Sequence, residues 1–187
     1  MAKIKLNAAS GGGSVAFESP ASLASDKVIK FPNSPNVGIQ TIRKEFTDFF
    51  STTALIPLDN SIPQSSEGAE VFTQAITPTA SSSKILITVV LNLANDVAQI
   101  QVGALFRDSV ANALAAGWAR TSLANNPNSP MVIQYLDSPS STSAVTYKVR
   151  VGYSGNSAST VQVNGGSGAR YLGGALASGM TLTEISA

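Results

Sequence analysis

Carboxylates are the side chains of this sequence best suited to chemistry, since it has 11 Asp and Glu residues, no His and no Cys. Glu67 and Glu70 lie close in sequence, whereas Asp137 and Glu184 can meet only through folding. Neither spacing marks the paired carboxylates of an acid–base mechanism. Without His, the commonest general base and metal ligand are missing. We therefore expect no enzyme, no catalytic residue and no cofactor or metal, although a site of carboxylates alone stays open.

A glycine-rich segment, GGSGAR at 165–170, resembles part of a phosphate-cradling loop. It lacks the lysine of such loops and does not open a helix. Its glycines are explained more simply by the positive φ angles of a long loop between two strands. We expect no phosphate site there.

Trp118 is the single tryptophan and stands in an Ala- and Gly-rich segment close to Arg120. Trp and Arg are enriched at the centres of protein interfaces, which makes this pair a candidate subunit interface. The alternative is an anchor in the core or in a loop. Aromatic residues make up only 6% of the chain, and most fall on inward faces of the expected strands. This argues against a carbohydrate-binding module.

The composition predicts a β-rich protein without a nucleic-acid or membrane partner. Charged residues are 12% of the chain and the net charge is +1, so the clustered Lys and Arg of a phosphate-binding surface are missing. Ser and Thr supply roughly a fifth of the residues, above ordinary usage. No apolar run is long enough to cross a membrane. Nor does one follow Lys3 and Lys5, so we expect no secretory signal and a cytoplasmic origin.

The first 45 residues differ from the rest and predict an extended N-terminal arm. Short alternating pieces flank three glycines, and Pro20, Pro32 and Pro35 follow. Proline and glycine exclude a central sheet position, yet the arm is too apolar for a free linker. The residues expected to contact a partner are Ile4, Leu6, Gly11, Gly12, Gly13, Val15 and Phe17. A disordered terminus or an edge extension of the same domain is the alternative.

Residues 46–187 read as about eight strands separated by turn residues, which predicts an all-β, antiparallel, jelly-roll-like β-sandwich. KILITVVLNL (84–93) and VTYKVRVGY (145–153) alternate clearly. The first of these and AQIQVGALF (98–106) suggest a long hairpin. SVANALAAGWAR (109–120) could instead form a short helix capped by Ser109. The apolar last strand, MTLTEIS (180–186), is expected to pair inside a sheet.

YLDSPSSTSAVTYKVRV (135–151) resembles β-sandwich modules of tailed-phage virion proteins, namely tail fibres and decoration proteins of marine and cyanobacterial phages. In those modules similar segments stand where this chain has Ser83–Val90, Arg107–Ser109 and Thr181–Ser186. The resemblance covers roughly residues 75–187, and the opening KIKLNAASGGGSVAFESPAS is similar to the N-termini of other phage structural proteins. The motifs are structural, and the repetitive shaft of a fibre is missing.

The resemblance implies a non-enzymatic virion protein, with the arm as anchor and the sandwich displayed. Because no shaft separates them, it implies a capsid decoration, or cement, protein bound to the major capsid protein on the capsid surface after assembly in the host cytoplasm. A homo-oligomer is expected, a trimer before a dimer. The alternative is a short head or tail fibre that binds a host receptor through loops such as 121–130 and 165–179.

Overall fold

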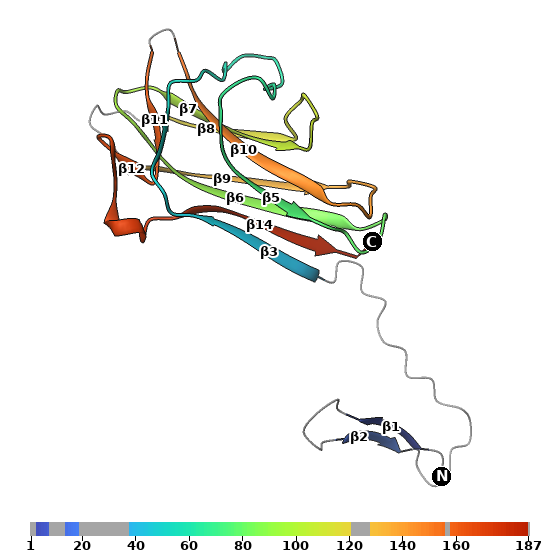
Figure 1. Cartoon of the computed structure of the whole chain (residues 1–187). Coiled ribbons are helices and arrows are strands. Elements are labelled where there is room, and N and C mark those ends of the chain that lie inside the picture. The colour runs from blue at the N-terminus through green and yellow to red at the C-terminus, as the bar shows by residue number, and fades with distance from the viewer. Residues whose placement is uncertain (1–2, 8–13, 19–37, 121–127, 156–157, 187) are drawn as a thin grey trace. The chain divides into compact units, whose positions relative to one another are not determined.

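The computed structural model describes residues 3–7, 14–18, 38–120, 128–155 and 158–186. The chain forms two compact units, Met1–Ser34 and Pro35–Ala187. In the described part the only helical segment is the 3-10 turn η1 (Leu172–Gly174), and nearly everything else is strand or loop (Figure 1). The all-β prediction is confirmed.

The second unit is a sandwich of two antiparallel sheets. The first sheet has the order β3 (Gly38–Phe46), β14 (Ser178–Ile185), β6 (Lys84–Asn95), β9 (Ser129–Asp137). The second has the order β5 (Ala69–Ile76), β10 (Val145–Ser154), β7 (Ile100–Arg107), β8 (Ala115–Arg120). Short strands β4 (Phe50–Thr52) and β11 (Val161–Val163) extend the first sheet beside the end of β6.

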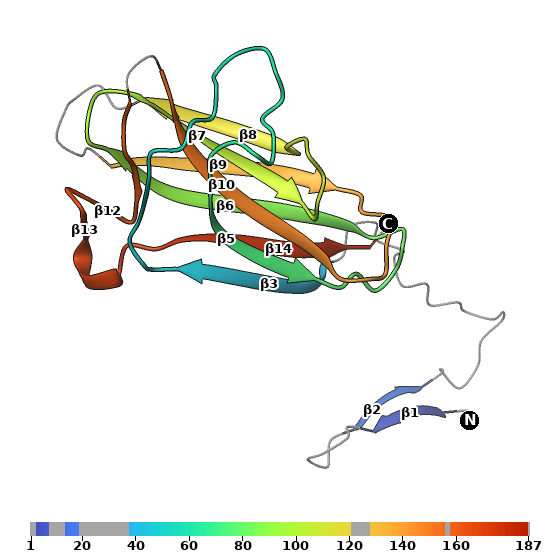
Figure 2. The same cartoon turned by 45° about the horizontal axis from the view of Figure 1, so that its top comes forward.

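This strand order makes the sandwich a jelly roll. The chain passes from β3 to β5, from β6 to β7, from β8 to β9 and from β10 to β14, and each passage changes sheet. Two four-stranded sheets connected in this way are the jelly-roll arrangement, and Figure 2 shows the two layers one above the other. The last strand, β14, pairs with β3 on one edge and β6 on the other, which confirms the expectation that it lies inside a sheet.

The core fills the space between the sheets and follows the period-2 alternation of the strands. The inward residues of β6 are Ile85, Ile87, Val89, Leu91 and Leu93, and all five are fully buried. Tyr147, Val149 and Val151 of β10 are buried as predicted, while Tyr153 is half-buried at the end of the strand. A second cluster, with Ile56 at its centre, lies on the outer side of β7.

The outer side of the second sheet is partly covered by the segment between β4 and β5. Ile56 donates its backbone N–H to Tyr153 O at 3.0 Å, and Tyr153 donates to Ala54 O at 3.0 Å. Gly152 makes this approach possible, because a Cβ there would lie 2.8 Å from both Ala54 O and the Ile56 side chain. The covering segment is residues 53–68.

The predicted hairpin of residues 84–106 is wrong. β6 and β7 follow one another in sequence but belong to different sheets, and residues 96–99 carry the chain across the sandwich. β6 pairs with β14, β11 and β9, and β7 pairs with β10 and β8. Alternation shows which face of a strand is buried but not which strand lies beside it, so two strands in facing sheets resemble a hairpin.

The possible helix at 109–120 is not formed, and its second half is strand β8. Ser109 lies in a turn in which Val110 N–H donates to Arg107 O at 3.0 Å. β8 then pairs with β7 over six residues, and Ala115 and Ala119 pack against the core. Alanine has the highest intrinsic helix propensity, but propensities differ by less than about 1 kcal/mol per ordinary residue, and tertiary pairing with a neighbouring strand overrides that preference here.

The sandwich begins before residue 46. Residues 38–45, which the sequence analysis assigned to the arm, lie in β3, whose partner is the C-terminal strand β14. Two features concealed this strand. Prolines stand close before it, and its pairing partner is more than 130 residues away in sequence. The boundary between the units falls after Ser34.

Candidate functional site

The carboxylates that could have formed an acid–base pair are used for local structure. Glu67 Oε2 accepts the backbone N–H of Gln64 at 2.8 Å and closes a turn. Glu70 lies 3.9 Å from Arg150 Nη1 in a half-exposed ion pair. These two contacts hold the loop before β5 in place.

Asp137 and Glu184 come together in the fold, but not as a pair. Both lie opposite Ile85, Glu184 on β14 and Asp137 on β9, so two inter-strand spacings of about 5 Å each separate their backbones. Asp137 accepts two bonds from Arg107 Nη1 at 2.9 Å and one from the Tyr147 hydroxyl at 2.7 Å. Burial, together with the bond to the Asp137 carboxylate, raises the pKa of Tyr147.

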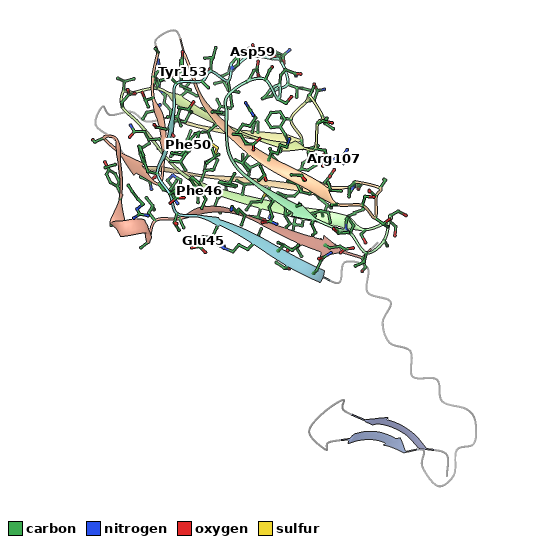
Figure 3. The ribbon with its side chains drawn as sticks, in the orientation of Figure 1. Glu45, Phe46, Phe50, Asp59, Arg107 and Tyr153 are labelled. Atoms are coloured by element: carbon green, nitrogen blue, oxygen red, sulfur yellow. The ribbon has the colours of Figure 1, made fainter. Side chains whose placement is uncertain are left out.

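The Asp137 network joins the two sheets at one end of the sandwich. Asp137 comes from the first sheet, and Arg107 and Tyr147 are cross-strand partners in the second. Figure 3 shows Arg107 and Tyr153 toward opposite ends of this second sheet. Asp137 is 4% exposed and Tyr147 is fully buried, so the network is a structural tie between the sheets.

Glu184 is also fully buried and satisfied. Its carboxylate accepts hydrogen bonds from Gln40 Nε2 at 2.6 Å and from the backbone and hydroxyl of Thr79, each at 2.7 Å. Burial alone would raise the pKa of Glu184, but the donors from Gln40 and Thr79 outweigh it and lower the pKa to about 2. The carboxylate therefore links β14, β3 and the loop after β5.

We expect acid to destabilise the sandwich through Glu184. Because the folded pKa of about 2 lies below the ordinary pKa of 4.5, the stabilisation is present above pH 4.5 and is lost as the pH falls toward 2. The loss is on the order of 1–3 kcal/mol. Urea unfolding at pH 7, 4 and 2.5 measures it. Glu184→Gln should flatten this pH dependence, whereas Glu45→Gln on the exposed face should not; equal slopes for all three proteins would contradict the assignment.

The glycine-rich segment forms a miniature hairpin, β12 (Gly165–Gly166) with β13 (Ala169–Arg170). Ser167 and Gly168 at its tip have φ angles of 50° and 76°. Two successive residues with positive φ are typical of the tight turns that close hairpins. The explanation by positive φ therefore applies to Gly168 alone, while Gly165 lies in β12, where a Cβ would clash with Ala169 O. Across the described ranges no group of three or more metal-ligating side chains occurs, and no helix there is long and apolar enough to span a membrane.

The described part of the arm is a two-stranded ribbon. β1 (Lys3–Asn7) pairs antiparallel with β2 (Ser14–Glu18), with Ile4 opposite Phe17 and Leu6 opposite Val15. Residues two apart share a face, and so do cross-strand partners. The four apolar arm residues predicted as contacts therefore occupy one face of the ribbon. Gly11, Gly12 and Gly13 lie outside the described residues.

Trp118 and Arg120 lie on the outer side of β8, and both are exposed. The Trp118 side chain is 58% exposed, which contradicts its interpretation as a core anchor and leaves it free to contact a partner. The sequence had offered both possibilities, and only the alternation of β8 decides between them. In the pairing of β7 with β8, Trp118 stands opposite Val102 and Arg120 opposite Ile100.

A further surface was missed at the sequence level: the outer face of the first sheet. Its exposed residues carry few charges. They are Thr41, Arg43 and Glu45 on β3, Lys84 and Val90 on β6, and Pro130, Val132, Gln134 and Leu136 on β9. Figure 3 shows Glu45 on this side and Asp59 on the opposite side of the sandwich. On β6 this face also carries Leu86, Thr88 and Asn92, which are half-buried, whereas Val90 is 39% exposed.

Comparisons with known proteins give similarity in structure alone. No protein-family profile matches the sequence, and no curated protein matches it. Particles derived from infectious bursal disease virus contain a similar chain, with 15% identity and a TM-score of 0.36 over 94% of this chain and 43% of the other. The VP2 subviral particle of that virus gives 12% identity and a TM-score of 0.35, over 93% and 46%.

The Gt strain of infectious bursal disease virus gives 13% identity and a TM-score of 0.37, over 96% of this chain and 44% of the other. This chain therefore spans less than half the length of the viral chains it resembles. All three TM-scores are below 0.5, so the jelly-roll assignment rests on the strand order and register of this chain.

Proposed function

We propose that this protein is a virion structural protein that decorates an assembled phage capsid, anchored by its arm. The observation that supports this most is the register of β1 and β2, which places Ile4, Leu6, Val15 and Phe17 on one face of a ribbon. That ribbon belongs to a unit separate from a sandwich with its own core. A separate apolar ribbon is the arrangement expected of an anchor.

The ribbon needs a partner for physical reasons. A two-stranded ribbon alone is marginally stable in water, because its apolar face has nothing to pack on. Burying four such side chains against a partner contributes about 6–12 kcal/mol, which is offset largely by the ordering of the ribbon. Binding per copy is therefore weak, and many copies or an oligomer supply the rest through avidity.

Decoration of a shell then stabilises it by mass action. A protein that binds the assembled shell and not free subunits shifts the equilibrium toward the shell. The partner is the major capsid protein, and the proposed location is the capsid surface after assembly in the host cytoplasm. Jelly-roll domains occur in viral capsids and in lectins, so the fold suits a displayed module without deciding its role. We propose a homotrimer, with a dimer as the alternative.

Paired substitutions on the two faces of the ribbon test this proposal. Leu6→Asp with Phe17→Asp adds two charges to the apolar face, and Asn7→Asp with Ala16→Asp adds two to the opposite face. We expect the first variant to bind empty shells at least about tenfold more weakly, since charges resist burial, and the second to bind within about twofold of the parent. Co-sedimentation with shells lacking the protein measures this.

Equal loss in both variants would show that added charge, and not the apolar face, prevents binding. Full binding by both would place the anchor elsewhere. Circular dichroism of each variant checks that the sandwich is intact, and the separation of the two units predicts that it is.

A short head or tail fibre is the second candidate function. The observation in its favour is the exposed Trp118 with the groove beside it, because a receptor-binding module needs such a surface. Labelled antibody against the protein, viewed on virions by electron microscopy, separates decoration from a tail fibre: label on the tail supports the tail fibre, and label over the head supports decoration or a head fibre.

A further inference from the structure

A shallow pocket lies between the covering segment (53–68) and β8, on the outer side of the second sheet. Its volume is about 160 Å³, and its lining includes Leu58, Asp59, Pro63, Val102 and Trp118. Leu58 is 46% exposed and Trp118 is 58% exposed. An indole, a leucine and a proline thus remain in contact with water around one small depression. Clusters of exposed apolar side chains are rare on soluble proteins and often mark a binding site.

One carboxylate is held at this pocket in a fixed orientation. Asp59 Oδ1 accepts the backbone N–H of Ser61 at 2.7 Å and its hydroxyl at 2.5 Å. These bonds, the hydroxyl first, lower the pKa of Asp59, so the group is an acceptor at neutral pH. Within the described residues no hydrogen bond involves Oδ2, which is therefore available to a ligand.

The size and charge of the pocket limit the ligand. Pockets for drug-sized ligands have volumes of about 300–1,000 Å³, so a pocket of 160 Å³ accepts a single ring. Arg120 lies two residues beyond Trp118 on the same face of β8, about 7 Å along the strand, and its positive charge repels a cationic ligand. The negative charge of Asp59 repels an anionic ligand, so a neutral ligand fits the pocket best. A second protein subunit with a flat surface would not fill the depression between the covering segment and β8, so the pocket fits a small ligand better than a subunit.

We propose that this pocket binds a neutral hexopyranose, with one face of the sugar ring stacked on Trp118 and a hydroxyl donating to Asp59 Oδ2. A pyranose combines an apolar C–H face with hydroxyl donors, which matches an aromatic side chain beside a carboxylate acceptor. A second pocket of about 360 Å³ shares Pro57, Leu58 and Asp59 with the first. It provides a place for the next sugar of a chain.

This site does not depend on the role of the arm, and either proposed function can include it. It also assigns Trp118 to a small ligand in place of the subunit interface expected from the sequence. It reverses the sequence-level argument against carbohydrate binding, because Trp118 is the exposed aromatic side chain that such binding needs.

The single tryptophan of the chain gives a direct test. Emission of the full-length protein is followed during titration with the methyl glycosides of glucose, mannose, galactose and N-acetylglucosamine. We expect a saturable change with at least one of them and a dissociation constant in the ~1–10 mM range. Asp59→Asn should weaken binding about fivefold or more with the free emission unchanged. Gln134→Ala, on the outer face of the first sheet, should bind as the parent does.

Three results would overturn the proposal. The first is no saturable change with any of the four glycosides up to about 50 mM. The second is tighter binding of choline chloride than of any sugar, which would indicate a cation site. The third is a blue shift that depends on protein concentration in the absence of sugar, which would show that a second copy covers Trp118. Trp118→Phe, followed by saturation-transfer NMR, checks that the indole carries the binding.

Discussion

Asp137→Ala lowers the free energy of unfolding by about 3–5 kcal/mol, the largest stability effect we expect among the polar substitutions discussed for this sandwich. The carboxylate is the only group that the structure shows bonded to both Arg107 and the hydroxyl of Tyr147 among the described residues. Its removal leaves a fully buried hydroxyl without an acceptor and an Arg107 guanidinium, on a side chain that is 26% exposed, without the carboxylate that it bonds. For a sandwich of this size the midpoint of thermal unfolding should fall by roughly 10 °C or more.

Three further variants separate the causes of this effect. Tyr147→Phe removes one donor and should cost about 1 kcal/mol. Asp137→Asn keeps the shape of the side chain but not its charge. Its loss of unfolding free energy should lie between those of Asp137→Ala and Tyr147→Phe. Glu45→Gln, in the exposed pair with Arg43 at 3.8 Å, should change stability by less than about 0.5 kcal/mol. If Asp137→Ala were as mild as Glu45→Gln, the tie between the sheets would not exist.

The same network gives a structural role to two of the sequence segments, 107–109 and 135–151. The segment at 135–151 supplies Asp137 and Tyr147, and the segment at 107–109 supplies Arg107. The sequence analysis described these motifs as structural and without a catalytic residue. In the structure three polar side chains from two sheets satisfy one another where the core would otherwise leave them unpaired.

Fold class and strand faces were predictable because they depend on local alternation. The buried set of β6, from Ile85 to Leu93, follows directly from the period of two. Partner choice was not predictable in the same way. The β6–β7 hairpin was wrong and β3 was missed, because both depend on contacts between residues distant in sequence.

Asn164 illustrates a determinant that no local pattern indicates. It has a φ of 58° and is fully buried. Its amide donates to Phe46 O at 2.7 Å and Asp48 O at 3.1 Å, and its carbonyl oxygen accepts the Ser178 hydroxyl at 2.7 Å. One asparagine thus joins the end of β3, the start of β14 and the residue after β11. In the sequence it is simply the residue before a glycine-rich loop.

The candidate surfaces were predictable to different degrees. The apolar arm residues were identified from alternation, and the register of β1 and β2 adds that they share a face. Trp118 was noted for its residue type, but the pocket beside it depends on the covering segment, whose position follows from Ile56 and the space above Gly152. The outer face of the first sheet could not be recognised before the strand order was known.

Deleting residues 1–20 tests the central claim, that the arm anchors and the sandwich is displayed. The core lies within Pro35–Ala187, so the truncated protein should fold, stay soluble and unfold with the midpoint of the parent. It should no longer decorate empty shells, because the ribbon with its apolar face has been removed.

The measurement is the occupancy of purified empty shells by full-length and truncated protein, at equal concentration and after the same circular-dichroism check of folding. Our account predicts near-saturation for the full chain and an occupancy at least about tenfold lower for the truncated one, as expected when the contacts that hold a weak, multivalent ligand are removed. A folded, truncated protein that fills the shells to the same occupancy would contradict it and would place the anchor in the sandwich.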